Sequence, residues 1–396
     1  MDASVRDLDA LARAVTGRET SVFDPALAQL SDQVFQAYHR SRILVTGGAG
    51  FIGGQTLRLL LALEPAKVVV ADTWENGLAE LVRDLRAEGA IGERTAFEPR
   101  LVDVTGPLLE RVVRDDGPFD TVLAFAAAKH VRTERDAVSA LHMLNVNVNG
   151  TYRALSAAVA TNPDCRLFMV STDKAADPSS LMGASKRVME EFVMGAFPTA
   201  TTTRFANVAF SSGSLLESWL IRLGRGQVLP APADTTRYFV RPVEAGQLCM
   251  LASVAPPGSI VVPGDGVVDA VELTVALERM LGAMGLPWRR VEPAEAVGNL
   301  PDHSSVRVLV TARDTAGEKA AESFVGTGEQ RVAWLPAVDT IAPSPPRAAC
   351  ADVAHWIDSA TRAVPGPGVD EIVERVASAV PEFQHVTSER RLDDRI

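Results

Sequence analysis

A strand-like run that passes through a glycine-rich turn into a helix constrains the fold of this chain more than any other stretch. Residues 42–46 (RILVT) lead into Gly47, Gly50 and Gly53 at the spacing G-x-x-G-x-x-G, and residues 55–63 have a helical pattern. Gly47 permits the tight turn, Gly50 lets the backbone approach a pyrophosphate, and Gly53 lets the helix pack closely on the strand. The start of the helix then offers free amides and a positive dipole end to phosphate groups. Because strand, turn and helix follow in this order, the stretch predicts a dinucleotide-binding unit.

The next strands end in acids that suit the rest of a dinucleotide. Residues 68–71 precede Asp72, about 20 residues past the glycines, where a carboxylate accepts the hydroxyls of an adenosine ribose. An acid repels a 2′-phosphate and no arginine follows Asp72 directly, so the sequence favours NAD over NADP. Asp103 ends a further strand, where it is placed to contact an adenine edge, and the small residues 126–128 let a cofactor lie close over the sheet. The expected cofactor-binding residues of these segments are Gly47, Gly50, Phe51, Ile52, Gly53, Asp72, Asp103, Val104, Ala126, Ala127 and Ala128.

Strand-like and helix-like runs alternate from residue 42 to residue 209. This alternation predicts an α/β fold with a Rossmann-type, doubly wound parallel sheet. Beyond it, the pattern predicts a helix from Leu273 to Met284, a strand at 306–311 and a linker or extended arm at 335–348. The expected organisation is an N-terminal helical appendage (1–40), an NAD-binding domain (41–209), a smaller α/β substrate-binding region (210–330) and a Pro-rich arm with a helical tail (331–396). The appendage packs on the main domain or is exchanged with a neighbouring subunit.

Composition and charge narrow the class of protein. The 396 residues are 47% hydrophobic and 22% charged, which is ordinary for a globular protein with a sizeable core. A net charge of −11 argues against nucleic acid or an anionic membrane as a general partner. Cys165, Cys249 and Cys350 are few and widely spaced, so we expect no disulfide framework and no metal site. The chain start lacks the features of a signal peptide, and no apolar run approaches the roughly 20 residues of a membrane helix. A soluble, cytoplasmic protein is therefore expected.

Reactive side chains gather where the strand-like run 167–170 ends. Thr172, Asp173 and Lys174 follow it directly, and Lys186 lies in the helix-like run beyond. Ligands bind at the carboxyl edge of open α/β sheets, so these residues form a compact candidate set for proton transfer. Asp173 and Lys174 are adjacent, and their side chains could point to different parts of one ligand. The alternative is a strand-end turn whose charges are merely solvated.

Further polar residues suit a phosphorylated substrate. His130 enters the predicted crevice, although a packing role is as good an interpretation as a catalytic one, and Asn147 could bridge a helix to the site through water. Ser211 could hold phosphate. Arg237 could bind a diphosphate beside the aromatic wall of Tyr238, with a surface ion pair as the alternative. The expected substrate-binding residues are Lys129, His130, Asn207, Ser211, Arg237 and Tyr238.

Taken together, these motifs resemble the extended short-chain dehydrogenase/reductases. Within that family the chain is similar to the polysaccharide-biosynthesis branch, which includes UDP-N-acetylglucosamine 4,6-dehydratases and their relatives. The segments that carry the resemblance are 45–53, 74–81, 126–131, 171–175, 182–187, 204–208 and 236–239, with more distant similarity at 314–319 and 392–394.

The resemblance implies a reaction and roles for individual residues. NAD(P)⁺ takes hydride from C4 of the sugar, water is eliminated across C5 and C6, and hydride returns to C6 to give a 4-keto-6-deoxy sugar. Asp173 is then the acid toward O6, and Lys174 handles the proton at C5. Lys186 binds the nicotinamide ribose and lowers the pKa of its neighbours, with Thr172 as a hydroxyl partner. The catalytic set is Asp173, Lys174, Lys186, Thr172 and Met182.

Met182 is a departure from the usual family pattern, which has a tyrosine base four residues before the lysine. The three tyrosines of the chain, Tyr38, Tyr152 and Tyr238, do not precede a lysine at that spacing. A thioether cannot relay a proton, so the C4 base is open between Lys174 and a water held by Thr172. Part of the branch is similar to this chain in having methionine there.

The resemblance implies an NAD-dependent nucleotide-sugar 4,6-dehydratase with a UDP-linked substrate, acting as a homo-oligomer. A nucleotide-sugar epimerase or ketoreductase on the same scaffold is the first alternative. A cofactor-binding subunit without turnover is the second, and Met182 is the residue that keeps it open.

Overall fold

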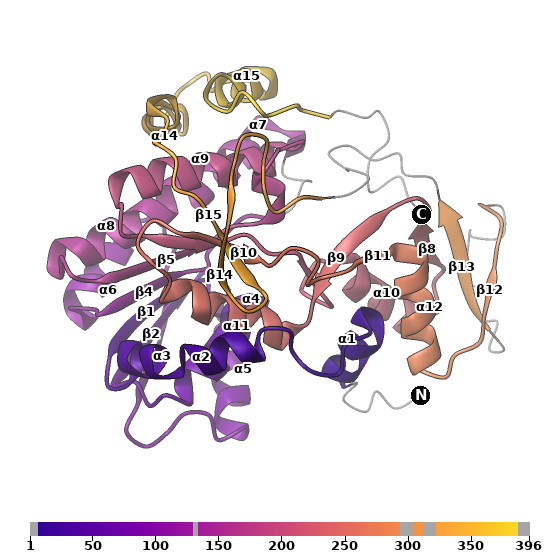
Figure 1. Cartoon of the computed structure of the whole chain (residues 1–396). Helices are drawn as coiled ribbons and strands as arrows, with labels where there is room; N and C mark the ends of the chain where they lie inside the picture. Colours follow the sequence, from indigo (N-terminus) through magenta and orange to yellow (C-terminus); the bar gives the residue numbers. More distant parts are fainter. Residues whose placement is uncertain (1–6, 130–133, 294–304, 312–321, 387–396) are drawn as a thin grey trace.

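The computed structural model describes residues 7–129, 134–293, 305–311 and 322–386. Its centre is a nine-stranded sheet with the order β14-β15-β10-β6-β5-β4-β1-β2-β3 (Figure 1). Neighbouring strands from β3 to β10 run parallel, whereas β15 and β14 pair antiparallel at one edge. The strands are β1 (Arg42–Thr46), β2 (Lys67–Asp72), β3 (Ala96–Leu101), β4 (Thr121–Ala124), β5 (Arg166–Val170), β6 (Thr201–Thr203), β10 (Ile260–Pro263), β14 (Arg331–Leu335) and β15 (Val338–Ile341).

The order in which successive strands are added to the sheet reverses between β1 and β4. Strands β2 and β3 extend the sheet to one side of β1, and β4, β5 and β6 extend it to the other. This order confirms the predicted Rossmann-type doubly wound sheet. The reversal point is where ligands bind in such sheets, at the carboxyl ends of the strands.

Helices cover both faces of the sheet and bury two apolar layers (Figure 1). One layer packs under α2 (Asp24–Gln29), α3 (Ser31–Tyr38), α4 (Phe51–Leu61), α5 (Glu75–Ala87) and α11 (Pro242–Ser253). The opposite layer packs under α6 (Leu108–Asp116), α7 (Ala137–Leu144), α8 (Thr151–Thr161), α9 (Leu181–Ala196), α14 (Ala348–Ala360) and α15 (Val369–Ala379). Within the described ranges, no helix is both long and apolar enough to cross a membrane.

A smaller region with its own core lies beside the main sheet (Figure 1). It contains the sheets β11-β9-β7 and β12-β13-β8. Its elements are α1 (Leu8–Thr16), β7 (Asn207–Val208), α10 (Leu215–Gly224), β8 (Leu229–Pro232), β9 (Thr236–Val240), β11 (Ala270–Glu272), α12 (Leu273–Ala283), β12 (Trp288–Arg290) and β13 (Val306–Thr311). The N-terminal helices pack on their own chain, α1 in this small core and α2 and α3 on the main sheet.

The C-terminal part differs from the expected linker at 335–348. Residues 338–341 (VDTI) form β15, which pairs with β10 of the main sheet from Ile260↔Ile341 to Pro263↔Val338. The prolines of this stretch lie at the turn before β15 and after its end. They leave the four strand residues free to pair, because proline interferes only where a backbone N–H is needed. The helices that follow pack on α9 and bury Ile357, Ile372 and Val376.

Candidate active site

The glycine turn and the end of β2 form one hydrogen-bonded unit. Gly47 has a φ of 69°, and a Cβ added to it would lie 2.4 Å from the backbone N of Ala126, after β4. Asp72 accepts a hydrogen bond from the N–H of Ala49 through Oδ2, at 3.0 Å, and from the N–H of Trp74 through Oδ1, also at 3.0 Å. Gly50 precedes α4 and makes no side-chain cap, so the first amides of that helix are not engaged by a capping side chain. The ends of β1, β2 and β4 therefore meet at a cradle of backbone amides.

Of the remaining predicted cofactor residues, Asp103 is exposed and forms its own turn. Its Oδ1 accepts hydrogen bonds from both the N–H and the hydroxyl of Thr105, at 2.8 Å each. Val104 is buried against Gly150, where an added Cβ would lie 2.7 Å from the valine side chain.

Asn147 holds the loop after β4 in place. Its amide accepts a hydrogen bond from the N–H of Ala128 at 2.9 Å and donates one to the Ala128 carbonyl at 3.0 Å. It also donates to Ser185 of α9 at 2.9 Å. Asn147 lies in a π-helical segment, η2 (Asn145–Gly150), and is fully buried. The amide thus contacts the loop directly, whereas the sequence suggested a bridge through water.

Asp173 lies in the turn η3 (Asp173–Ala175) after β5, and its side chain is 1% exposed. Its Oδ1 accepts a hydrogen bond from the Thr172 hydroxyl at 2.8 Å and lies 3.5 Å from Lys174 Nζ. The two charged side chains therefore point toward one another, unlike the divergent arrangement that their adjacency suggested. Its Oδ2 is buried and has no hydrogen-bond partner among the described residues. A buried carboxylate oxygen without a partner costs free energy and is rare in structures, so this atom marks a candidate reacting group.

Lys186 reaches back from α9 to the same strand end. Its Nζ donates a hydrogen bond to the Val170 carbonyl at 3.0 Å. Burial lowers the pKa of Lys186 to about 8, and the charge of Glu190 opposes this shift only in part. Close packing fixes the position of the helix, since a Cβ on Gly183 would lie 2.4 Å from the Lys174 carbonyl oxygen. Near neutral pH this amine can both hold and release a proton.

Met182 lies at the start of α9 and is 5% exposed within the hydrophobic core. Its N–H donates to Glu134 Oε1 at 2.9 Å, and Glu134 Oε2 lies 3.3 Å from His385 Nε2 near the C-terminal end of the described chain. Sequence reasoning did not identify Glu134 or His385. The two are separated by 251 positions, so no local pattern connects them.

Lys129, in the loop after β4, lies near Lys174 of the reacting set, which consists of Thr172, Asp173, Lys174 and Lys186. Lys129 donates a hydrogen bond to the Ser212 carbonyl at 2.6 Å, which joins the loop after β4 to the turn before α10. Burial lowers the pKa of Lys129; the charge of Glu217 opposes this shift and that of Lys174 adds to it. Ser211 is buried in the same turn. His130 lies outside the described residues.

The predicted substrate residues Asn207, Arg237 and Tyr238 lie together on paired strands. Asn207 of β7 is opposite Phe239 of β9 and donates to the Tyr238 carbonyl at 3.4 Å. Arg237 is buried at 8% exposure and donates a hydrogen bond to the Thr236 carbonyl at 2.8 Å. The ring of Tyr238 packs at 5.2 Å from that of Phe324.

The Polysaccharide biosynthesis protein family matches residues 43–332. The match spans the glycine turn, the reacting set and the strands that carry Arg237. The chain belongs to this family. It is an extended short-chain dehydrogenase/reductase of the polysaccharide-biosynthesis branch, as its motifs predicted. Separately, within the described residues no group of three or more His, Cys, Asp and Glu side chains could hold a metal ion.

One relative within this family is the capsular polysaccharide biosynthesis protein CapD of Staphylococcus aureus. It is 28% identical over 265 residues, which are 64% of this chain and 43% of CapD. The chain thus spans less than half the length of this curated relative.

Two solved structures have a fold similar to that of this chain. The UDP-N-acetylglucosamine 4-epimerase of Methanobrevibacter ruminantium, in complex with UDP-N-acetylmuramic acid, has a TM-score of 0.55 at 15% identity, over 73% of this chain and 90% of the epimerase. WbmG of Bordetella bronchiseptica, in complex with NAD and UDP, has a TM-score of 0.50 at 22% identity, over 69% and 85% of the two chains. At these identities the likeness is one of fold.

Proposed function

We propose that this chain is an NAD-dependent nucleotide-sugar 4,6-dehydratase with a UDP-linked N-acetylhexosamine as substrate. The observation that carries the proposal is Asp173, a buried acid at the end of β5 with one carboxylate oxygen lacking a described partner. Elimination of water from a sugar needs an acid for the leaving hydroxyl and a base for the adjacent C–H. Asp173 and Lys174 provide both groups within 3.5 Å.

The residues around the glycine turn fit a dinucleotide. The first amides of α4 suit its phosphates, Asp72 suits the adenosine ribose, and Ala126 to Ala128 leave room for a flat group over the sheet. Lys186, held by the Val170 carbonyl, suits the second ribose. Bound NAD would supply reversible hydride transfer, first from C4 and then to C6. The fold shared with WbmG, solved with NAD and UDP, supports this assignment.

The proton transfers fall to the reacting set. Asp173, in its protonated form, donates its proton to the C6 hydroxyl as that group leaves, and Oδ2, which has no hydrogen-bond partner among the described residues, is the atom suited to do so. Lys174, whose side chain is 28% exposed, removes the proton from C5. The base at C4 must also come from this set, because the thioether of Met182 cannot accept a proton. Lys174 is the better candidate, since the hydroxyl of Thr172 already donates to Asp173. Lys174 then passes the C4 proton to Asp173 across 3.5 Å, which leaves the amine neutral for the proton at C5 and gives Asp173 the proton for the leaving hydroxyl.

The smaller region would bind the nucleotide and the diphosphate. Arg237 supplies a buried guanidinium for the diphosphate, and Tyr238 and Asn207 form a wall. Ser211 approaches from the turn before α10 and Lys129 from the loop after β4. The enzyme is proposed to work as a homo-oligomer, with residues 41–209 as the cofactor domain and residues 210–330 as the substrate region.

Mass spectrometry of the product from UDP-N-acetylglucosamine tests the proposal. A dehydratase gives a product lighter by one water. An epimerase, which the solved fold relative makes a real alternative, gives a product of unchanged mass that chromatography separates from the substrate. An unaltered substrate with NAD still bound would instead support a subunit without turnover.

A further inference from the structure

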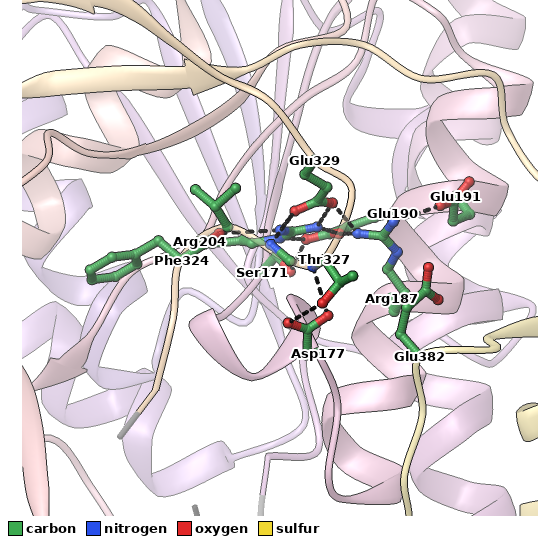
Figure 2. A network of polar contacts seen from close by, with 12 residues as sticks. Ser171, Asp177, Arg187, Glu190, Glu191, Arg204, Phe324, Thr327, Glu329 and Glu382 are labelled. Atoms are coloured by element: carbon green, nitrogen blue, oxygen red, sulfur yellow. Dashed lines mark hydrogen bonds and ion pairs between the residues drawn. The ribbon is translucent and has the colours of Figure 1, made fainter. Parts of the chain in front are cut away.

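A fully buried arginine follows β6 and uses every hydrogen-bond donor that it has (Figure 2). Arg204 forms one two-pronged contact with Glu190 of α9, at 2.9 and 2.6 Å, and another with Glu329, at 2.6 and 2.9 Å. The remaining N–H donates to the Phe324 carbonyl at 3.2 Å. These bonds account for all five guanidinium donors. The position of Glu329 relative to α9 is thus fixed by geometry as well as by charge.

The network continues outward as alternating charges. Arg187 contacts Glu329 and lies 3.1 Å from Glu191, and Arg347 pairs with Glu382 at 2.6 Å. Burial alone would raise the pKa of Glu329, but the hydrogen bonds and charges of Arg204 and Arg187 outweigh burial and lower that pKa to about 2. The carboxylate is therefore charged at neutral pH.

The loop that carries Glu329 also contacts residues 176 and 177, just after the reacting residues 172–174, and the expected substrate wall at Tyr238. Thr327 donates its N–H to Asp177 Oδ1 at 2.9 Å and its hydroxyl to Oδ2 at 3.3 Å (Figure 2). Gly326 packs so closely that an added Cβ would lie 2.8 Å from the Ala176 carbonyl oxygen. At its other end, the ring of Phe324 lies against Tyr238.

The ion-pair network around Arg204 also contacts Ser171, the first residue after β5. The hydroxyl of Ser171 donates to Glu190 Oε1 at 2.5 Å, and Glu190 is the charge that partly offsets the lowered pKa of Lys186. One ionic cluster thus contacts the end of β5, the helix of Lys186 and the 324–329 loop.

We propose that residues 324–329 form a brace that positions the reacting turn 172–177 relative to α9 and to the Tyr238 wall. Glu329 and Asp177 are its positioning residues. The inference rests on the proposed function only in taking residues 172–186 as the reacting set. A displacement of about 1 Å in a reacting group can lower a rate by roughly a hundredfold, so a brace that contacts both sides of the site controls turnover without touching substrate.

The test compares four variants of the full chain. Asp177→Ala removes the acceptor for Thr327, whereas Asp177→Asn keeps one acceptor oxygen for its N–H and should restore most of the contact. Asp358→Ala is the matched control, because Asp358 also accepts two hydrogen bonds, from Arg153 and Asn149, but ties α14 to α8 and η2 instead. Glu329→Gln is a second probe of the brace, read only where thermal unfolding shows a folded protein.

Hydrogen exchange of the peptide spanning 171–182 is the deciding measurement. Asp177→Ala should speed its exchange roughly tenfold, the factor for losing one charge-assisted hydrogen bond. Asp177→Asn and Asp358→Ala should exchange that peptide like the wild type. With UDP-N-acetylglucosamine, Asp177→Ala should lower kcat roughly ten- to hundredfold while KM stays within about twofold.

The two proposals fail separately. Unchanged exchange of residues 171–182 in both Asp177→Ala and folded Glu329→Gln overturns the brace, whatever the activity. Equal acceleration in Asp358→Ala would also overturn it, because the effect would then be general loosening. A wild-type protein that leaves the sugar nucleotide unaltered overturns the dehydratase assignment, and the exchange result still decides the brace.

Discussion

Lys186 Nζ donates a hydrogen bond to the carbonyl oxygen of Val170 across 3.0 Å, which ties the middle of α9 to the end of β5. This bond keeps a buried amine at the carboxyl edge of the sheet. The only charged group that stabilises its protonated form, among those that shift its pKa, is Glu190. The amine therefore loses its proton far more readily than an ordinary lysine.

Stability should depend on pH through this lysine. The pKa of Lys186 is about 8 in the folded protein, against 10.5 for an ordinary lysine side chain. Between these values the unfolded chain therefore binds one more proton than the folded one. The free energy of unfolding of the wild type, relative to Lys186→Met, should then rise with pH across this window, by on the order of 3 kcal/mol. Urea unfolding of both proteins at the two ends of the window measures the difference. A wild-type-minus-variant difference in the free energy of unfolding that stays constant or falls as pH rises would contradict the assignment.

Asp72 should set the preference for NAD. Its carboxylate is fixed against the glycine turn by the N–H of Ala49, where a 2′-phosphate would meet a negative charge. Asp72→Ser should therefore weaken the preference for NAD⁺ over NADP⁺. Calorimetry with both dinucleotides tests this, and equally tight binding of the two by the wild type would refute it.

Arg237 should bind the diphosphate of the substrate. A charge-assisted contact of this kind is worth about 1.5–3 kcal/mol, so Arg237→Ala should raise the Kd for the sugar nucleotide roughly ten- to hundredfold. NAD affinity should not change. Because Arg237 is buried, thermal unfolding of the variant is the necessary control. A folded variant with wild-type affinity for UDP would exclude this role.

Substitution of Asp173 or Lys174 should lower the dehydration rate far more than substitution of Met182. Removing a general acid or base costs about 100- to 10,000-fold, so Asp173→Asn and Lys174→Ala should both fall in that range with NAD still bound. Met182 is packed in the hydrophobic core, and a volume-conserving Met182→Leu change should alter the rate only a few-fold. Single-turnover kinetics would show the contrast. Full dehydratase activity in Asp173→Asn would make the proposed proton transfers wrong.

Local patterns predicted the parts of this protein that local physics determines. The glycine spacing predicted the turn at Gly47, and the β-branched run at 306–311 coincides with β13. The run 335–348 was misjudged because its prolines dominate the composition, although they lie outside β15.

Contacts between distant segments could not be predicted in the same way. Arg204 and Glu329 are 125 positions apart, and nothing in either neighbourhood indicates the partner. Arg204 stood within a recognised motif, but its burial and its double pairing with Glu190 and Glu329 emerge only when the sheet and the 324–329 loop come together. The same holds for Glu134, which accepts a hydrogen bond from Met182 at the start of α9.

The packing of α14 and α15 on α9 has a consequence for how the protein is made. A ribosome releases the chain from its N-terminus onward, so the helix of Lys186 emerges long before the segments that cover it. Glu191 of that helix can form its ion pair with Arg347 only after residue 347 has been made, and Arg347 can pair with Glu382 only later still. Until these residues leave the exit tunnel, the apolar side of α9 stays open to water and to chaperones. The surroundings of α9 are therefore completed only once residues 347–385 have been made, and a chain truncated before Arg347 would carry the glycine turn and the reacting stretch but an unfinished site.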